Sequence, residues 1–142
     1  MAFTPVQILQ VVSQPTAIVR GPATTTNLPP RIRALFDEFY KGFQGKAGLN
    51  IVYYPSWHES HEFDIECGVQ VESGGNSATP AGTVATLAYF GPYDQMKPAH
   101  EEIHRYVRAN GHQIAGPSWE VYGHWSDDPA HLRTDIFYLL AH

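Results

Sequence analysis

The feature that most constrains the fold is an internal repeat. Two Gly-Pro pairs, beginning at Gly21 and Gly91, each follow a short apolar run and lie 70 residues apart (91 − 21). Two Asp-Ile pairs, at Asp64 and Asp135, lie 71 residues apart (135 − 64). Landmarks that keep one order and nearly one offset favour a tandem duplication over chance matches. We therefore predict two equivalent halves, with Gly21 superposing on Gly91 and Asp64 on Asp135.

Each half carries one amphipathic helical pattern between extended segments, which predicts the order strand, helix, strand, strand. In the first half these elements are expected at about 16–20, 31–43, 50–54 and 62–71. In the second half they are expected at about 83–90, 93–109, 118–124 and 133–140, with "NG" at 110–111 ending the helix. A further strand near 6–12 is expected at an edge of the sheet. The pattern predicts an α+β fold with both helices on one face and a cleft along the other face.

The chain reads as a single domain of 142 residues. Repeat one spans about 6–72 and repeat two about 83–140. The Gly/Ser/Pro-rich stretch "SGGNSATPAG" at 73–82 is expected to be the linker between them.

Composition excludes several classes of function. The formal net charge is −5 and no basic stripe is present, so direct nucleic-acid binding is not expected. The single cysteine, Cys67, excludes an internal disulfide and fits a reducing compartment. No signal-peptide pattern or membrane-spanning apolar run is found, so we expect a cytoplasmic protein without membrane contact.

The stretch "HEEIH" at 100–104 matches the H-E-x-x-H pattern of zinc metalloproteases. On a helical projection, however, His100 lies at the rim of the apolar stripe and His104 at its edge, with Glu101 on the wet side. A metalloprotease needs both histidines directed into an enclosed cleft. We therefore expect no functional metal here, and at most adventitious metal at "HESHE" (58–62).

The stretch "GPSWEVYGHW" at 116–125 is the candidate functional strand. Its alternation places Trp119 and Val121 on one face and Glu120 and Tyr122 on the other. We expect the Trp119 face to pack on the helices, which leaves Glu120 in the open cleft. A carboxylate among aromatic rings suits a lipophilic cation. The same carboxylate, if desolvated, could act as a general acid or base.

The sequence also resembles a known family. The stretches "YFGPYDQMKPAHEEIHRYVRANGHQIAGPSWEVY" and "DPAHLRTDIFYLL" are similar to the GyrI-like small-molecule-binding domain, also called the bacterial transcription-activator effector-binding domain. "RGPATTTNLPPRIRALFDEFYKGF", "IVYYPS" and "FDIECGVQV" of the first half agree. The resemblance covers the chain from about residue 6 and implies tandem SHS2-type repeats, a curved antiparallel sheet and a central ligand cleft.

The resemblance also implies site residues. The family's acidic cleft residue falls on Glu120. Its aromatic lining falls on Tyr53, Trp57, Tyr89, Trp119, Tyr122 and Tyr138. The family often has histidine at the position of Tyr89, so this chain departs from the pattern there. No DNA-binding segment is read before the domain, so a free-standing family member is expected.

Three functions follow as alternatives. The first is binding of a lipophilic aromatic or cationic drug or toxin, for sequestration, sensing or detoxification. The second is a hydrolase that opens cyclopropanoid genotoxins, with Glu120 and Tyr122 as acid and base. The third is binding of a protein partner such as DNA gyrase. No cofactor is expected, although haem is a minor alternative because the chain has eight histidines.

Overall fold

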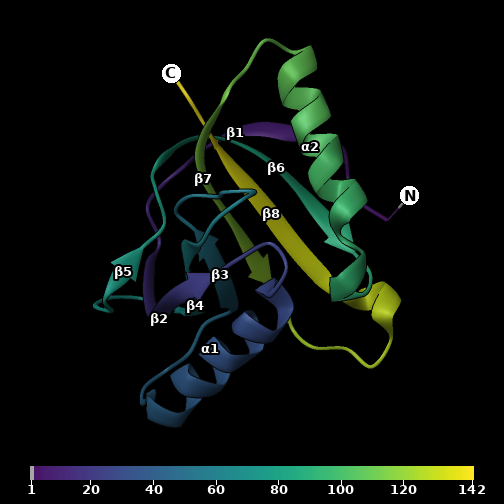
Figure 1. Cartoon of the computed structure of the whole chain (residues 1–142). Coiled ribbons are helices and arrows are strands. Elements are labelled where there is room, and N and C mark those ends of the chain that lie inside the picture. The colour runs from purple at the N-terminus through teal and green to yellow at the C-terminus, as the bar shows by residue number, and fades with distance from the viewer. Residues whose placement is uncertain (1) are drawn as a thin grey trace.

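The computed structural model describes residues 2–142, which form one eight-stranded antiparallel sheet and two α-helices (Figure 1). The helices are α1 (Leu28–Gly42) and α2 (Lys97–Ala109), with short 3-10 turns η1 (Tyr93–Gln95) and η2 (Pro129–His131). The strands are β1 (Gln7–Val11), β2 (Pro15–Ala23), β3 (Asn50–Tyr54), β4 (Phe63–Gln70), β5 (Ser77–Ala78), β6 (Gly82–Phe90), β7 (Ile114–Tyr122) and β8 (Arg133–Leu140).

The order of strands in the sheet is β1-β6-β8-β7-β3-β4-β2-β5. The second-half strands β6, β8 and β7 run from the outside to the centre, and the first-half strands β2, β4 and β3 do the same from the other side. The halves meet where β3 pairs with β7, from Asn50 opposite Tyr122 to Tyr54 opposite Ser118. The predicted α+β class and the edge position of the first strand are confirmed. The predicted linker contains the two-residue strand β5, which pairs with β2.

The landmarks of the repeat do not occupy equivalent places in the ladders. Asp64 pairs with Pro22, directly after Gly21, whereas Asp135 pairs with Ala88, three residues before Gly91. The predicted superposition is therefore wrong by four residues of register. A shift of even length leaves every side chain on its original face. The alternation of apolar and polar residues in a strand is unchanged by an even shift. Matching the two halves by sequence therefore gave the wrong register.

The helices begin and end at residues with restricted backbones. Pro29 and Pro30 lie in the first turn of α1 and Pro98 in the first turn of α2, where the missing N–H costs no helical hydrogen bond. Gly111, with φ of 75°, follows the last turn of α2 in the left-handed conformation that glycine adopts without strain. The predicted stop at 110–111 is confirmed.

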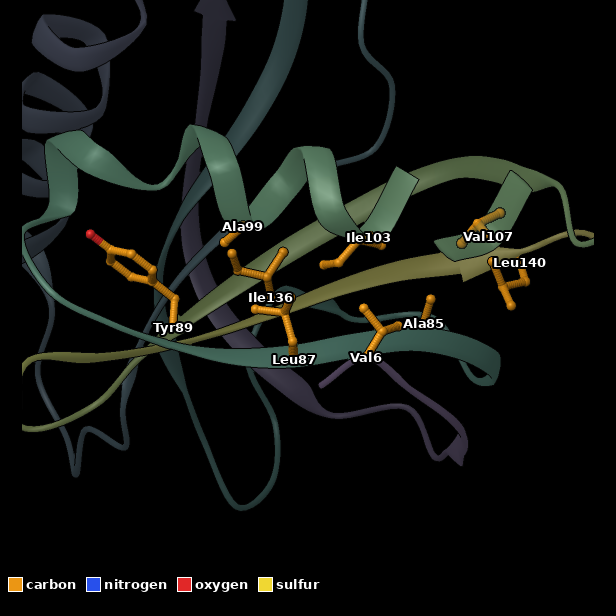
Figure 2. Packing of buried hydrophobic residues seen from close by; sticks show 9 residues of the cluster. All are labelled: Val6, Ala85, Leu87, Tyr89, Ala99, Ile103, Val107, Ile136 and Leu140. Atoms are coloured by element: carbon orange, nitrogen blue, oxygen red, sulfur yellow. The ribbon is translucent and has the colours of Figure 1, made fainter. Parts of the chain in front are cut away.

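Both helices pack on one face of the sheet. From α2, Ala99, Ile103 and Val107 point at β6 and β8, as Figure 2 shows. The residues of that buried cluster are Val6, Ala85, Leu87, Tyr89, Ala99, Ile103, Val107, Ile136 and Leu140. From α1, Leu35 packs with Val52, Ile65 and Cys67. Val52 pairs with Glu120, and Glu120 with Ile136, so the two clusters and Glu120 share this face.

The helix-free face carries a third cluster, formed by Ile51, Val84, Trp119 and Val121. The predicted packing of Trp119 against the helices is therefore wrong, and Glu120 lies on the helix-bearing face. The sheet curls into a half-barrel, so its helix-free face buries side chains of its own without a covering helix. The two faces of β7 are almost equally buried, with Trp119 4% and Glu120 5% exposed.

Strand β7 starts four residues earlier than predicted, at Ile114 rather than 118. Its pairing with β8 shifts register between Ile114 and Ser118. Gly116, with φ of 131°, and Pro117 lie at this irregularity. The Gly-Pro pair thus forms a bulge within the strand instead of a turn before it, because glycine tolerates the backbone that a bulge requires.

Candidate functional site

A pocket of about 620 Å³ opens on the helix-bearing face, between α1, the η1 segment and the end of β7. Its volume falls in the range of about 300–1,000 Å³ that is usual for small-molecule sites. Its walls come from both halves of the chain. The lining residues are Leu28, Pro29, Ile32, Arg33, Phe36, Asn50, Tyr54, Tyr93, Asp94, Met96, Glu120, Tyr122, Gly123 and Trp125.

Glu120 is the buried charge of this pocket. The hydroxyl of Tyr122 donates a hydrogen bond to Oε1 of Glu120 at 2.6 Å. The Tyr54 hydroxyl lies 3.5 Å from the same oxygen, which is long for a strong hydrogen bond. Tyr54 reaches this point from β3 and Tyr122 from β7, so the carboxylate is held across the central strand pair.

The second carboxylate oxygen of Glu120 faces α2. Nε2 of His100 lies 2.7 Å from Oε2 of Glu120. Nδ1 of the same ring lies 2.6 Å from the hydroxyl of Tyr138 on β8. The first histidine of "HEEIH" is thus engaged at both ring nitrogens. The helical projection placed His100 at the rim of the apolar stripe, and in the structure this rim faces β7 and β8.

Burial keeps the phenols of the site protonated. Burial raises the pKa of both Tyr54 and Tyr122 well above the ordinary value, and the charge of Glu120 adds to the rise. Burial and then the charge of Glu120 also raise the pKa of Tyr138. These hydroxyls therefore act as hydrogen-bond donors and not as anions. Burial raises the pKa of the Cys67 thiol to about 12, so this cysteine is not a nucleophile near neutral pH.

Aromatic rings lead from Glu120 to the solvent. The ring of Tyr122 meets that of Tyr93 edge to face at 5.3 Å, and Tyr93 lies 6.5 Å from Trp125. Tyr93 is 40% and Trp125 71% exposed. The pocket therefore combines an aromatic rim with a buried carboxylate, which is the arrangement that attracts organic cations. Two carboxylates, Glu120 and Asp94, and one cation, Arg33, line it.

Of the residues predicted for the site, Glu120 and Tyr122 line the pocket. Tyr53 and Trp119 lie on the opposite face, where their rings meet edge to face at 6.1 Å. They turn away because Tyr53 pairs with Trp119 and strand side chains alternate.

The other three predicted residues lie on or near the helix-bearing face but do not line the pocket. Trp57 packs on Tyr54 and Phe63. Tyr89 is buried in the α2 cluster, and its hydroxyl donates to the Pro92 carbonyl at 2.8 Å. Tyr138 contacts Glu120 only through His100.

Sequence reasoning missed the α1 wall and the rim of the pocket. The spacing of Ile32 and Phe36 of α1 fits the apolar stripe of an amphipathic helix, which alone predicts core packing and not a pocket wall. They lie at the edge of that stripe and are partly buried. Tyr54 and Tyr93 were missed because nothing in the sequence distinguishes them from core tyrosines. Trp125 stands alone in the polar stretch "GHWSDD" at 123–128, and a single exposed aromatic residue gives no signal of a pocket rim.

A second buried carboxylate, Glu66, lies on the helix-free face. It is 2% exposed and binds the Arg20 guanidinium at 2.6 Å and the Ser77 hydroxyl at 2.6 Å. Because both carboxylate oxygens of Glu66 are bound by side chains of the sheet, we interpret Glu66 as a structural group. It offers a matched comparison for Glu120.

Within residues 2–142, no group of three or more histidine, cysteine, aspartate or glutamate side chains is arranged to hold a metal ion. Neither α1 nor α2 is long and apolar enough to cross a membrane.

The fold is similar to several solved structures. EcmrR in complex with DNA matches with 18% identity and a TM-score of 0.74, covering 99% of this chain and 58% of EcmrR. This chain thus spans little more than half the length of EcmrR. The EcmrR C-terminal domain alone matches with 18% identity and a TM-score of 0.72, covering 99% of both chains.

Two further structures match over nearly their whole lengths. SAV2435 bound to tetraphenylphosphonium has 14% identity and a TM-score of 0.69, covering 97% of this chain and 94% of that one. A hydrolase from Listeria innocua has 9% identity and a TM-score of 0.63, covering 96% and 92%. At these identities the likeness establishes the fold alone.

A search of curated proteins finds no significant match. The family model of the GyrI-like small molecule binding domain matches residues 5–140, which is nearly the whole chain. This match agrees with the observed α+β fold of two helices and one eight-stranded antiparallel sheet. The chain belongs to the GyrI-like small molecule binding domain family.

Proposed function

We propose that this protein binds a lipophilic aromatic or cationic small molecule in the pocket between α1 and β7. The observation that carries the proposal is Glu120, a buried carboxylate at the base of a largely apolar pocket, with protonated phenols at Oε1. A charge buried in this way is costly unless something pairs with it. An organic cation supplies both the countercharge and the rings that fit the aromatic walls. The relative SAV2435, which was solved with tetraphenylphosphonium, supports the choice of ligand class.

Tetraphenylphosphonium is therefore the first probe, and isothermal titration the measurement. The Glu120→Gln variant keeps the shape of the side chain but removes its charge. A desolvated charge contact with aromatic support contributes about 2–4 kcal/mol, so we expect affinity to fall by roughly 30- to 1000-fold.

Glu66→Gln is the matched control, because it removes a buried carboxylate from the face without the pocket. It is expected to lower stability but leave affinity for the probe near that of the wild type. Equal affinity in Glu120→Gln and wild type would refute the role of Glu120. Failure of the wild type to bind any probe of this class would favour the alternative of a protein partner such as DNA gyrase.

A second candidate function is hydrolysis of a strained electrophile such as a cyclopropanoid genotoxin. The observation that favours it is the hydrogen-bonded chain from Glu120 through His100 to Tyr138. These hydrogen bonds could carry a proton to or from the Glu120 carboxylate, and general acid–base catalysis needs such a transfer. Mass spectrometry after incubation with a cyclopropanoid compound decides between the functions. An unchanged ligand indicates a binder, and addition of water indicates a hydrolase.

We also infer a cytoplasmic location and no direct nucleic-acid partner. The support is the free buried thiol of Cys67 and the net charge of −5. Retention of duplex DNA by the protein at low salt in a filter-binding assay would contradict the second inference.

A further inference from the structure

The two carboxylate oxygens of Glu120 face different partners. Its Oε1 faces the pocket side with Tyr122, and its Oε2 faces the imidazole of His100 at 2.7 Å. The side chains of His100 and Glu120 are 25% and 7% exposed, so water screens this contact only in part. Within residues 2–142, His100 is the one basic side chain within ion-pair distance of Glu120.

The surroundings of His100 accommodate both charge states of its ring. When the ring is neutral, Nε2–H donates to Glu120 and Nδ1 accepts from the Tyr138 hydroxyl, 2.6 Å away. Burial raises the pKa of Tyr138, so this phenol keeps its proton. When the ring is protonated, both nitrogens donate, and the phenol oxygen accepts from Nδ1. Neither state leaves a ring nitrogen without a partner.

We propose that His100 is a specificity-determining residue whose proton competes with a cationic ligand for the charge of Glu120. This inference rests on the proposed function. With the imidazole protonated, the pair is neutral overall and the pocket presents little net charge to a cation. With the imidazole neutral, the full charge of Glu120 faces the pocket. By linkage, a bound cation must disfavour the proton on His100 by the same factor.

The prediction is therefore proton release on binding of cations and not of neutral aromatic compounds. Imidazole is the side chain that ordinarily changes charge between about pH 5 and 8. Affinity for a cation should accordingly rise with pH in that range. A neutral aromatic molecule bound in the same pocket has no charge for the proton to oppose, so its affinity should stay level.

Other charged and titratable groups face His100, and their effects on the pH dependence have to be distinguished from its own. Glu120 on β7 and Tyr138 on β8 face it from the sheet, and Tyr54 and Tyr122 adjoin it through Glu120. His104, on α2 itself, packs on the ring of Tyr138 at 4.8 Å.

The experiment is titration with tetraphenylphosphonium from pH 5.5 to 7.5, repeated in two buffers with different heats of ionisation. For the wild type we expect affinity to rise about tenfold over this range, within the usual span of coupled sites. We also expect a proton to be released at the acidic end. Triphenylphosphine oxide, which is neutral, should show neither effect.

His100→Gln removes the proton site and keeps an amide that can donate to Glu120, so it should abolish both the pH dependence and the proton release. His104→Gln is the matched control and should retain both. If His100→Gln does not fold, NMR of the wild-type histidine rings replaces it. At pH 5.5 the ring signals of His100 should change towards those of a neutral imidazole when the cation binds, and unchanged signals would overturn the proposal.

The outcomes separate the inference from the proposed function. Binding by the wild type with level affinity and no proton release would overturn the role of His100 and leave the proposed function standing. Retention of the pH dependence by His100→Gln would do the same. Failure of the wild type to bind the cation at any pH would overturn both.

Discussion

His104 shows how one side chain makes stability depend on pH. Burial lowers the pKa of His104, and the neighbouring His100 and Arg108 lower it further. The unfolded chain therefore binds a proton at a pH where the folded chain does not. Because stability rises with pH wherever the unfolded state holds more protons, acid below about pH 6.5 should destabilise the fold. The penalty is complete below the pKa of the folded state.

The corresponding substitution is His104→Gln. It should lose less stability than the wild type between pH 7.5 and 5, as measured by urea unfolding at each pH. His112→Gln, at an exposed histidine just beyond α2, is the control and should follow the wild type. An identical loss in His104→Gln and wild type would refute the assignment.

At this scale the sequence predicted the parity of β7 but not its surroundings. Alternation correctly separated Glu120 and Tyr122 from Trp119 and Val121. The alternation could not show which face meets the helices, because both faces of β7 are buried and neither is clearly polar. The contact of His100 with Glu120 could not be predicted either. A helical projection gives the angle of His100 on α2 but not the position of α2 over the sheet.

At the scale of elements, the segment that follows β7 shapes the mouth of the pocket. Trp125 lies in this segment, lines the pocket and is 71% exposed. A large aromatic ring exposed beside an apolar pocket gains contacts when a ligand arrives. Neither of the other two tryptophans, Trp57 and Trp119, lines the pocket.

Tetraphenylphosphonium should therefore alter tryptophan fluorescence mainly through Trp125. The Trp125→Phe variant should lose most of the signal change and bind about two- to fivefold more weakly, as expected for one cation–π contact near the surface. Trp57→Phe should retain both signal and affinity. A full signal change in Trp125→Phe would mean that the ligand binds elsewhere.

Element boundaries were predictable where local signals coincide with tertiary structure. The bounds of β3 and β8 match the prediction, and α2 ends as expected at Gly111. The start of β7 was missed because Gly116-Pro117 is typical of a turn. Only pairing with β8 keeps the chain extended through that bulge.

At the scale of the whole molecule, the sheet is continuous across the boundary between the halves. β3 and β7 pair over five residues each, and Tyr53 and Trp119 pack across this boundary. Burial on both faces of β7 ties the helix-side clusters to the cluster on the other face. The two halves are therefore expected to unfold together.

A chain carrying Trp57→Phe and Trp125→Phe tests this, because Trp119 at the boundary is then its only tryptophan. Its fluorescence and the helical circular dichroism should follow one urea transition, as a two-state domain requires. Two separated transitions would show that the halves unfold independently.

Tetraphenylphosphonium at 100 times its dissociation constant should add about 2.7 kcal/mol to the free energy of unfolding of the same chain.

Helix α1 presents different residues to the pocket and to the core. Leu35 and Phe39 are buried, whereas Arg33 and Phe36 line the pocket without being fully buried. Mutation can therefore change the residues that meet a ligand while the residues that hold the helix stay as they are. An evolving population can therefore alter which small molecules this protein binds in single steps, each with little loss of folded protein.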